Sequence, residues 1–258
     1  DRYESFAAAS VCLILNVPVV HLYGGELTEG AFDDSLRHAI TKIAHLHFTS
    51  TEEYRNRVIQ LGENPEFVFN VGAIGLDNIK RMKLLSKIEF EKSIGFKLKK
   101  KNIIVTFHPV TLEKQNSEKQ FKNLLDAIDE LDDTGIIFTK PNADNGGREI
   151  ISMIDKYVSK NSDRAVCFAS LGQLRYLSAL KYVDAVVGNS SSGIIEAPSF
   201  KIGTINIGDR QKGRIKTDSI IECDYDLKSI KVALKKLYSE SFQNLLKKIN
   251  SPYGEGDS

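Results

Sequence analysis

Small hydroxylated residues and glycines follow a short apolar run in the second half of the chain. The run 185–187 leads into Gly188-Asn189-Ser190-Ser191-Ser192-Gly193, and a helical pattern that carries Glu196 then begins. A strand, a Gly/Ser turn and a helix start can bind phosphate, because free N–H groups and the helix dipole favour an anion. Serine hydroxyls add donors, and glycine allows close backbone approach. A well-capped helix without any ligand is the competing interpretation.

A cluster of cations favours the anion-binding interpretation. Arg210, Lys212 and Arg214 follow another short apolar run, 203–207. Arginine suits phosphate because its planar fork donates paired, charge-assisted hydrogen bonds. We therefore predict an anion site that is formed by the serine turn and completed by Arg210 and Arg214.

Carboxylates and histidines gather in the first forty residues. Glu26 ends the stretch 21–26, whose two glycines permit a tight turn after a strand. A helical pattern then begins with Asp33, Asp34, Arg37 and His38. Asp33 or Asp34 would cap this helix, and each lies one turn before a cationic partner. Two carboxylates in one cleft suit an acid and a base, whereas a capped helix with two salt bridges and a solvated Glu26 is the alternative.

The elements that position these residues alternate along the chain, as in a parallel sheet with crossover helices. We expect strands at 17–20, 45–48, 67–69, 102–107, 135–139, 165–168, 185–187 and 203–207. A capping sequence at 50–53 predicts a helix that follows it and ends at 61. We expect the other helices at 2–15, 33–44, 76–90, 117–131, 147–158, 171–181, 193–200, 226–237 and 241–249. The predicted fold class is therefore α/β. A junction at 72–75 separates a domain at 1–75 from a second at 76–258.

Composition excludes several classes of function. The 258 residues carry a net charge of +1 with both signs interspersed, so nothing favours nucleic acid or an anionic membrane as a partner. The three cysteines are an odd number without zinc spacing, so we predict neither a metal site nor a disulfide framework. No apolar run reaches the length of a membrane span, and we expect a cytoplasmic protein.

Several separated motifs together resemble the hydrolysing UDP-N-acetylglucosamine 2-epimerases of sialic and legionaminic acid biosynthesis. The motifs are Asp1 to Glu4, His21 to Glu26, Asp33 to Lys42, Phe107 to Pro109, Gly188 to Glu196 and Gly208 to Arg214. The resemblance runs from Asp1 to about Tyr253. It implies a glycosyltransferase-B-like fold of two Rossmann-like domains, with the ligand in the cleft between them. It also implies a fragment, with 1–75 as the second half of the first domain and 76–258 as a UDP-binding domain without its last helix.

The resemblance assigns roles residue by residue. Its catalytic set is Asp1, Glu26, Asp33, His38 and Tyr23. Its UDP-binding set is Arg2, His108, Asn142, Ser170, Ser190, Ser191, Gly193, Glu196, Arg210 and Arg214, with the diphosphate on the serine turn and the ribose on Glu196. Family members carry Glu or His where Tyr23 stands, and tyrosine is a poor base at neutral pH. Glu26 would then act as the base, or Tyr23 as the acid partner.

The implied reaction needs no metal and no cofactor. A base removes the C2 proton while UDP leaves C1, and water then adds to the resulting glycal. The full-length enzyme is expected to be a homodimer or homotetramer with a UDP-sugar as its small-molecule partner. Four alternatives remain: a diacetamido-sugar (N,N'-diacetylbacillosamine) 2-epimerase, a non-hydrolysing epimerase, a glycosyltransferase and a UDP-binding module without activity.

Overall fold

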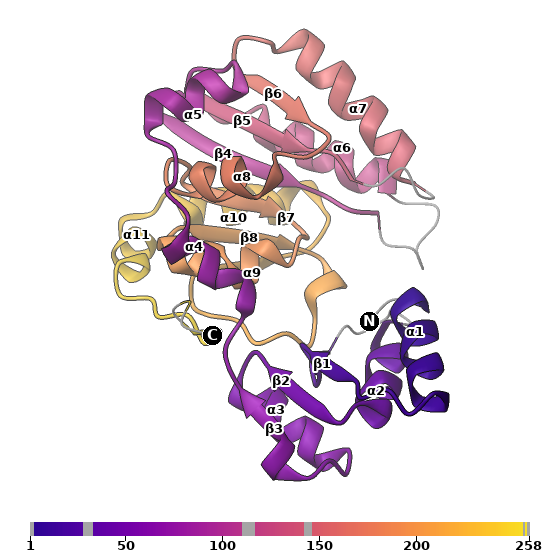
Figure 1. The fold of residues 1–258 in the computed structure, drawn as a ribbon. Helices are drawn as coiled ribbons and strands as arrows, with labels where there is room; N and C mark the ends of the chain where they lie inside the picture. The colour runs from indigo at the N-terminus through magenta and orange to yellow at the C-terminus, as the bar shows by residue number, and fades with distance from the viewer. Residues whose placement is uncertain (1–2, 28–32, 110–116, 142–145, 255, 257–258) are drawn as a thin grey trace. The chain divides into compact units, whose positions relative to one another are not determined.

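The computed structural model describes residues 3–27, 33–109, 117–141, 146–254 and 256. The chain divides into two compact units (Figure 1). Unit 1 comprises 1–81, 211–215 and 251–258, and unit 2 comprises 82–210 and 216–250. The predicted domains divided the chain once, at 75/76. The contacts divide it after Arg81, and two later segments return to pack with unit 1.

Unit 1 contains a three-stranded parallel sheet in the order β1-β2-β3. Its strands are β1 (Val20–Leu22), β2 (Leu46–Thr49) and β3 (Val68–Asn70). Its helices are α1 (Tyr3–Ile14), α2 (Asp33–Ile43), α3 (Glu52–Gln60) and α4 (Asp77–Arg81), with 3₁₀ turns at Pro65–Phe67 and Ile74–Leu76. Thr51 caps α3 by accepting the Tyr54 N–H at 3.2 Å, as the sequence 50–53 predicted.

Unit 2 contains a six-stranded parallel sheet in the order β6-β5-β4-β7-β8-β9. Its strands are β4 (Lys101–Thr106), β5 (Thr134–Thr139), β6 (Ala165–Phe168), β7 (Ala185–Gly188), β8 (Gly203–Ile207) and β9 (Ile220–Cys223). Its helices are α5 (Lys87–Ile94), α6 (Ser117–Ile128), α7 (Gly147–Lys160), α8 (Gly172–Leu180), α9 (Ser192–Ile195), α10 (Leu227–Leu237) and α11 (Glu240–Leu246). A 3₁₀ turn at Ala197–Phe200 also belongs to it, and a second, Asp209–Gln211, lies where the chain leaves unit 2 for unit 1. Numbered within the unit, the strand order is 3-2-1-4-5-6, which is that of doubly wound nucleotide-binding sheets.

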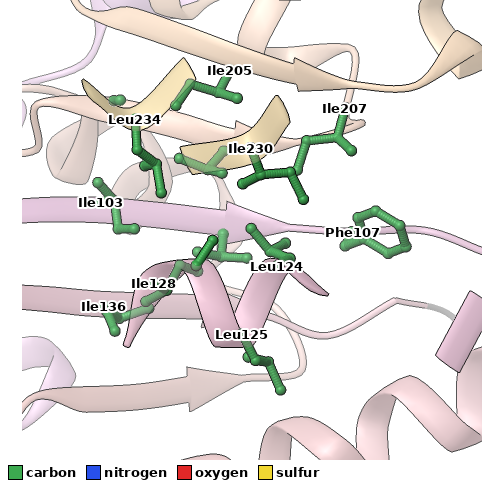
Figure 2. Close-up of a cluster of buried hydrophobic side chains, with 14 of the residues drawn as sticks. Ile103, Phe107, Leu124, Leu125, Ile128, Ile136, Ile205, Ile207, Ile230 and Leu234 are labelled. Carbon is green, nitrogen blue, oxygen red and sulfur yellow. The ribbon is translucent and has the colours of Figure 1, made fainter. Parts of the chain in front are cut away.

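Helices α6 and α10 pack side by side over one face of this sheet. Figure 2 shows Leu124 and Ile128 of α6 and Ile230 and Leu234 of α10 along β4, between Ile103 and Phe107, in one buried cluster. The strand residues Ile103 and Ile136 are fully buried, and so are their neighbours Ile104 and Ile137 on the opposite side of the pleat. Burial on both faces explains why these strands are continuous apolar runs without alternation.

The structure corrects two of the expected helices and adds a strand that was not expected. The helix expected over 76–90 is divided into α4 and α5, because Ser86 and Glu89 form a capping box that starts a new helix. The helix expected over 193–200 is only α9 followed by a 3₁₀ turn, since Pro198 has no N–H to continue the α-helical ladder. Strand β9 was not predicted.

Helix α1 exposes apolar side chains that a packed protein would normally bury. Only Ala9 is buried in α1, whereas Val11, Leu13 and Ile14 are exposed, and Ile14 is 78% exposed. The adjacent β1 is an edge strand. Contiguous apolar surface and an open strand edge both favour association. Within the described ranges, no helix is long and apolar enough to cross a membrane.

We expect the 258-residue chain to self-associate through this surface. Sedimentation velocity over a hundredfold range of concentration should show a rising mean mass. Ile14→Lys, which places a charge on the exposed face, should shift the distribution toward monomer. A wild-type chain that stays monomeric at every concentration would contradict this expectation.

Candidate functional site

The carboxyl ends of β4 and β7 are the topological switch point of the unit 2 sheet, where the chain runs off in opposite directions from neighbouring strands. Buried Asn189 joins the two ends. Its Oδ1 accepts the His108 N–H at 2.7 Å, and its Nδ2 donates to the His108 carbonyl at 2.8 Å. One side chain thus fixes both backbone groups of His108, a residue predicted to contact the diphosphate.

Gly188 is required where β7 passes β4. Its φ is +135°, a conformation that residues with a side chain rarely adopt. A Cβ on Gly188 would also collide with the Thr106 carbonyl oxygen, which accepts the Asn189 N–H at 3.1 Å. The close approach of the two strand ends therefore depends on this glycine.

The serine turn 189–192 is braced by Arg210. The Arg210 Nη1 donates to the Asn189 carbonyl at 2.9 Å, so the predicted anion ligand Arg210 lies beside the predicted serine turn. Ser191 is the N-cap residue of α9, yet it makes no side-chain capping hydrogen bond within the described chain. The side-chain bond to the start of the helix comes instead from Ser190, whose oxygen accepts the Ser192 N–H at 3.4 Å.

Helix α9 contributes less to an anion site than the sequence predicted. It has four residues, and a full macrodipole needs a longer run of aligned peptides. Hydroxyls and the guanidinium of Arg210 therefore remain as the stronger donors. Gly193 has a packing reason to be glycine, because a Cβ there would lie 2.6 Å from Thr204 Cγ2 of β8. Glu196 follows α9 directly as its C-cap residue.

Ser170 lies apart from this group. It follows β6, and β5 and β4 separate that edge strand from β7. Its hydroxyl accepts the Gly172 N–H at 3.1 Å, which occupies it in the turn that starts α8. The structure gives Ser170 a local role, and a role in nucleotide binding stays a prediction.

In unit 1, Glu26 is buried in an ion pair. Its Oε2 lies 2.9 Å from Arg214 Nη1, and its Oε1 accepts the Ser50 hydroxyl at 3.1 Å. The Glu26 side chain is 6% exposed and that of Arg214 is 12% exposed. The alternative of a solvated Glu26 is therefore wrong. Arg214 belongs to unit 1, whereas Arg210 belongs to unit 2, so the two arginines have different partners.

The segment that carries Arg214 is held at its next residue as well. The Ile215 N–H donates to the Tyr54 hydroxyl at 3.2 Å, and the Tyr253 hydroxyl donates to the Ile215 carbonyl at 2.9 Å. Both tyrosines are fully buried. Burial raises the pKa of Tyr253, which keeps it a neutral donor. The Tyr253 carbonyl in turn accepts the Ala73 N–H at 2.7 Å, which ties the 251–258 segment into unit 1.

The start of α2 places acid and base groups next to the Glu26 loop. Arg37, 2% exposed, donates from Nη1 to the Glu26 carbonyl at 2.8 Å and to Asp34 Oδ1 at 3.0 Å. Asp34 Oδ2 lies 3.6 Å from His38 Nε2, as the spacing predicted. Asp33 and Asp34 are the first two residues of the helix rather than residues before it. Burial lowers the pKa of Arg37, and the charge of Glu26 opposes this shift.

His21 shares a hydrogen bond with Thr41. The Thr41 hydroxyl lies 3.1 Å from the Arg37 carbonyl, which can only accept, and 3.2 Å from His21 Nδ1. Burial, with His47 nearby, lowers the pKa of His21 to about 4, so the ring is neutral at neutral pH.

Tyr23 has an uncommon backbone conformation, and its hydroxyl makes a hydrogen bond. Its φ is +64°, which is uncommon for a residue with a side chain. Its hydroxyl accepts the Gly75 N–H at 3.1 Å, so it holds the 73–75 turn near the end of β1. This contact is a structural use of the hydroxyl, and the acid role that we considered for Tyr23 stays a prediction.

The predicted residues fall into two separate sets. Unit 1 holds Tyr23, Glu26, Asp33, His38 and Arg214, and unit 2 holds His108, Ser170, Ser190, Ser191, Gly193, Glu196 and Arg210. Asp1, Arg2 and Asn142 lie outside the described residues. Sequence reasoning gave no role in the site to Asn189, Ser50 or Tyr54. Asn189 stood inside the quoted motif and Ser50 inside the capping sequence 50–53, but their site partners, like that of Tyr54, are distant in sequence. Over the described ranges, no three His, Cys, Asp or Glu side chains are grouped to hold a metal ion.

A doubly wound parallel sheet with a braced Gly/Ser turn at its switch point defines a class of α/β proteins that bind ligands at strand ends. The chain belongs to the UDP-N-acetylglucosamine 2-epimerase family, whose model matches residues 1–258. The resemblance drawn from the separated motifs is therefore confirmed.

Relatives and solved structures agree with this assignment. The chain is 48% identical over 94% of its length to the GDP/UDP-N,N'-diacetylbacillosamine 2-epimerase (hydrolyzing) of Campylobacter jejuni. It is 42% identical over 98% of its length to the polysialic acid biosynthesis protein P7 of Escherichia coli. The chain spans 63% and 64% of these two relatives. The UDP-GlcNAc 2-epimerase of Neisseria meningitidis, solved bound to UDP-GlcNAc, has the same fold. Its TM-score is 0.82 at 16% identity, covering 99% of this chain and 71% of that one, which confirms the predicted α/β fold class.

Proposed function

We propose that the protein is a hydrolysing UDP-N-acetylglucosamine 2-epimerase, which converts UDP-GlcNAc and water to N-acetylmannosamine and UDP. A base removes the proton on C2 as UDP leaves C1, giving a glycal. Water then adds to C1, and a proton returns to the opposite face of C2. Family membership supports the reaction class, and the observation that carries the assignment of a nucleotide site is the Asn189 brace at the switch point of the unit 2 sheet.

In this proposal unit 2 binds the nucleotide. Ser190, Ser191 and Arg210 take the diphosphate, because hydroxyl and guanidinium donors stabilise the charge that grows on the leaving group. The hydrogen bonds between Asn189 and His108 hold His108 beside these residues. Glu196 accepts a hydrogen bond from a ribose hydroxyl. Arg2, Asn142, Ser170 and Gly193 complete the proposed contacts.

Unit 1 supplies the acid and base groups in the proposal. Asp33 and His38 lie on the first turns of α2, half-buried and close to the Glu26 loop. Asp1 and Tyr23 belong to the same proposed set. Glu26 is also in the proposed catalytic set, and its ion pair with Arg214 holds the carboxylate in place. In this proposal Arg214 pairs with Glu26 and does not bind the diphosphate, which was its role in the sequence-based prediction.

A second candidate substrate is UDP-N,N'-diacetylbacillosamine. The Campylobacter relative at 48% identity and a Legionella pneumophila relative at 37% both carry that activity in their names. Incubation with each sugar nucleotide, followed by mass spectrometry, separates the two substrates. A free 2-epimer from UDP-GlcNAc supports the first assignment, and turnover of only the diacetamido substrate supports the second. A returned UDP-sugar would indicate a non-hydrolysing epimerase instead.

We expect Ser191→Ala and Arg210→Ala to weaken UDP binding by roughly tenfold or more each, since each removes a hydrogen bond to a charged group. Calorimetric titration of UDP measures this. Ser93→Ala is a matched control, because the Ser93 hydroxyl donates to the Phe90 carbonyl within α5. Unchanged affinity in both site variants would contradict the nucleotide assignment.

The cellular setting remains part of the proposal. Interspersed charge, with a net value of +1, supports a cytoplasmic enzyme that has no nucleic-acid partner. A homodimer or homotetramer is proposed for the enzyme, and sedimentation of the protein expressed from its own gene would test it.

A further inference from the structure

A chain of hydroxyl groups leads from α8 into the serine turn of unit 2. The Tyr176 hydroxyl lies 2.5 Å from Ser192 Oγ, and Ser192 Oγ lies 3.1 Å from Ser190 Oγ. Both distances are those of hydrogen bonds between hydroxyls. Tyr176 comes from α8, so the contact joins a separate helix to a turn that Arg210 already braces at Asn189.

Counting protons suggests a direction for this chain. Each hydroxyl has one proton to donate and lone pairs to accept with. The Ser190 oxygen already accepts the Ser192 N–H at 3.4 Å. If it also accepts from Ser192 Oγ, its own proton points away from the turn and is available to an outside acceptor. Tyr176 then donates to Ser192, and burial raises the pKa of Tyr176, which keeps the phenol protonated.

We propose that Tyr176 is a positioning residue for the diphosphate, acting through Ser192 to direct the Ser190 hydroxyl toward the ligand. This inference rests on the proposed function, because it takes UDP as the occupant of the serine turn. Hydrogen bonds in a chain polarise one another, so an anion at Ser190 strengthens each bond behind it. Without the phenol, the Ser192 hydroxyl loses its donor from α8, and the Ser190 hydroxyl is no longer held in one direction.

A packing role for Tyr176 makes a different prediction from this positioning role. Tyr176→Phe keeps the ring and its packing and removes only the hydroxyl. If the ring alone matters, this variant binds every ligand as the wild type does. If the hydroxyl positions Ser190, the loss falls on the diphosphate and spares the nucleoside, since uridine brings no anion to the turn.

The test is calorimetric titration of the 258-residue chain with UDP and with uridine. We expect Tyr176→Phe to bind UDP roughly three- to tenfold more weakly, the effect of one hydrogen bond, and to bind uridine unchanged. Ser192→Ala should give a similar loss of UDP affinity. The double variant should lose no more affinity than either single variant, because both substitutions interrupt the same series of hydrogen bonds.

Tyr182→Phe is the matched control. Its hydroxyl donates to the Leu85 carbonyl at 2.8 Å, in the same unit but outside the serine turn, so UDP affinity should not change. Equal UDP affinity of Tyr176→Phe and wild type would overturn the positioning role. So would a parallel loss of UDP and uridine binding, or additive losses in the double variant. A wild-type chain that binds no UDP would instead remove the proposed function, and this inference with it.

Discussion

Asp33→Asn is expected to lower turnover by roughly a hundredfold to ten-thousandfold, the usual cost of removing a general acid or base. UDP affinity should change little, because Asp33 lies in unit 1 and the proposed diphosphate ligands lie in unit 2. The neighbouring charges support this choice of residue. Asp34 already contacts Arg37 and His38, whereas Asp33 begins the helix half-buried beside them.

The measurement is steady-state turnover of the protein expressed from its own gene, together with isotope incorporation. In deuterated water the released sugar should carry deuterium at C2, and in heavy-oxygen water it should carry the label at C1. Asp226→Asn is the matched control, because Asp226 caps α10 and asparagine caps a helix equally well. Retention of the original C2 hydrogen would exclude proton abstraction, and full activity of Asp33→Asn would move the acid–base role to another residue.

Local sequence signals predicted the elements of unit 2 well. Continuous apolar runs predicted β4, β5, β7 and β8. Both faces of a parallel sheet are covered by helices, so polar residues do not alternate with the apolar ones in its strands. Strand β9 was missed since its four residues include Glu222 and Cys223 and lie on the sheet edge. The split of the 76–90 segment was readable in principle from the Ser86 and Glu89 spacing of a capping box.

The site was predictable only where its contacts are local. The Gly/Ser turn and the α2 carboxylates are continuous motifs, so their residues could be named from the sequence. The brace between Asn189 and His108 joins residues 81 positions apart, and the contact between Ile215 and Tyr54 joins residues 161 positions apart. Such pairs have no period or spacing in the sequence. The partnership of Glu26 with Arg214 was hidden for the same reason, and Arg214 was therefore grouped with Arg210.

Glu26→Gln is expected to destabilise unit 1 by about 3 kcal/mol, because removing one partner of a buried ion pair leaves the other charge uncompensated. The substitution removes a favourable charge interaction from two cations. Arg214 pairs directly with Glu26, and Arg37 feels both the favourable charge of Glu26 and the unfavourable charge of Arg214. Without the carboxylate, Arg214 loses its ion-pair partner, and the unfavourable interaction between the charges of Arg214 and Arg37 remains.

Hydrogen exchange followed by mass spectrometry measures this effect in each unit separately. A loss of about 3 kcal/mol should speed exchange of unit 1 peptides roughly hundredfold where exchange requires unit opening. Peptides of unit 2 should be unaffected. Glu53→Gln is the matched control, since its pair with Arg57 lies on α3 with Glu53 57% exposed, and such surface pairs contribute about 1 kcal/mol or less.

A double-mutant cycle with Arg214→Met separates a structural from a chemical role for Glu26. Arg214→Met alone should also destabilise unit 1, because it leaves a buried carboxylate without its ion-pair partner. The double variant should cost clearly less than the sum of the two single variants, as expected for residues in direct contact. Exchange rates of Glu26→Gln equal to those of wild type, combined with lost turnover, would show instead that the carboxylate acts only in the chemistry. The ion pair would then be a means of holding a base in position rather than a support of the fold.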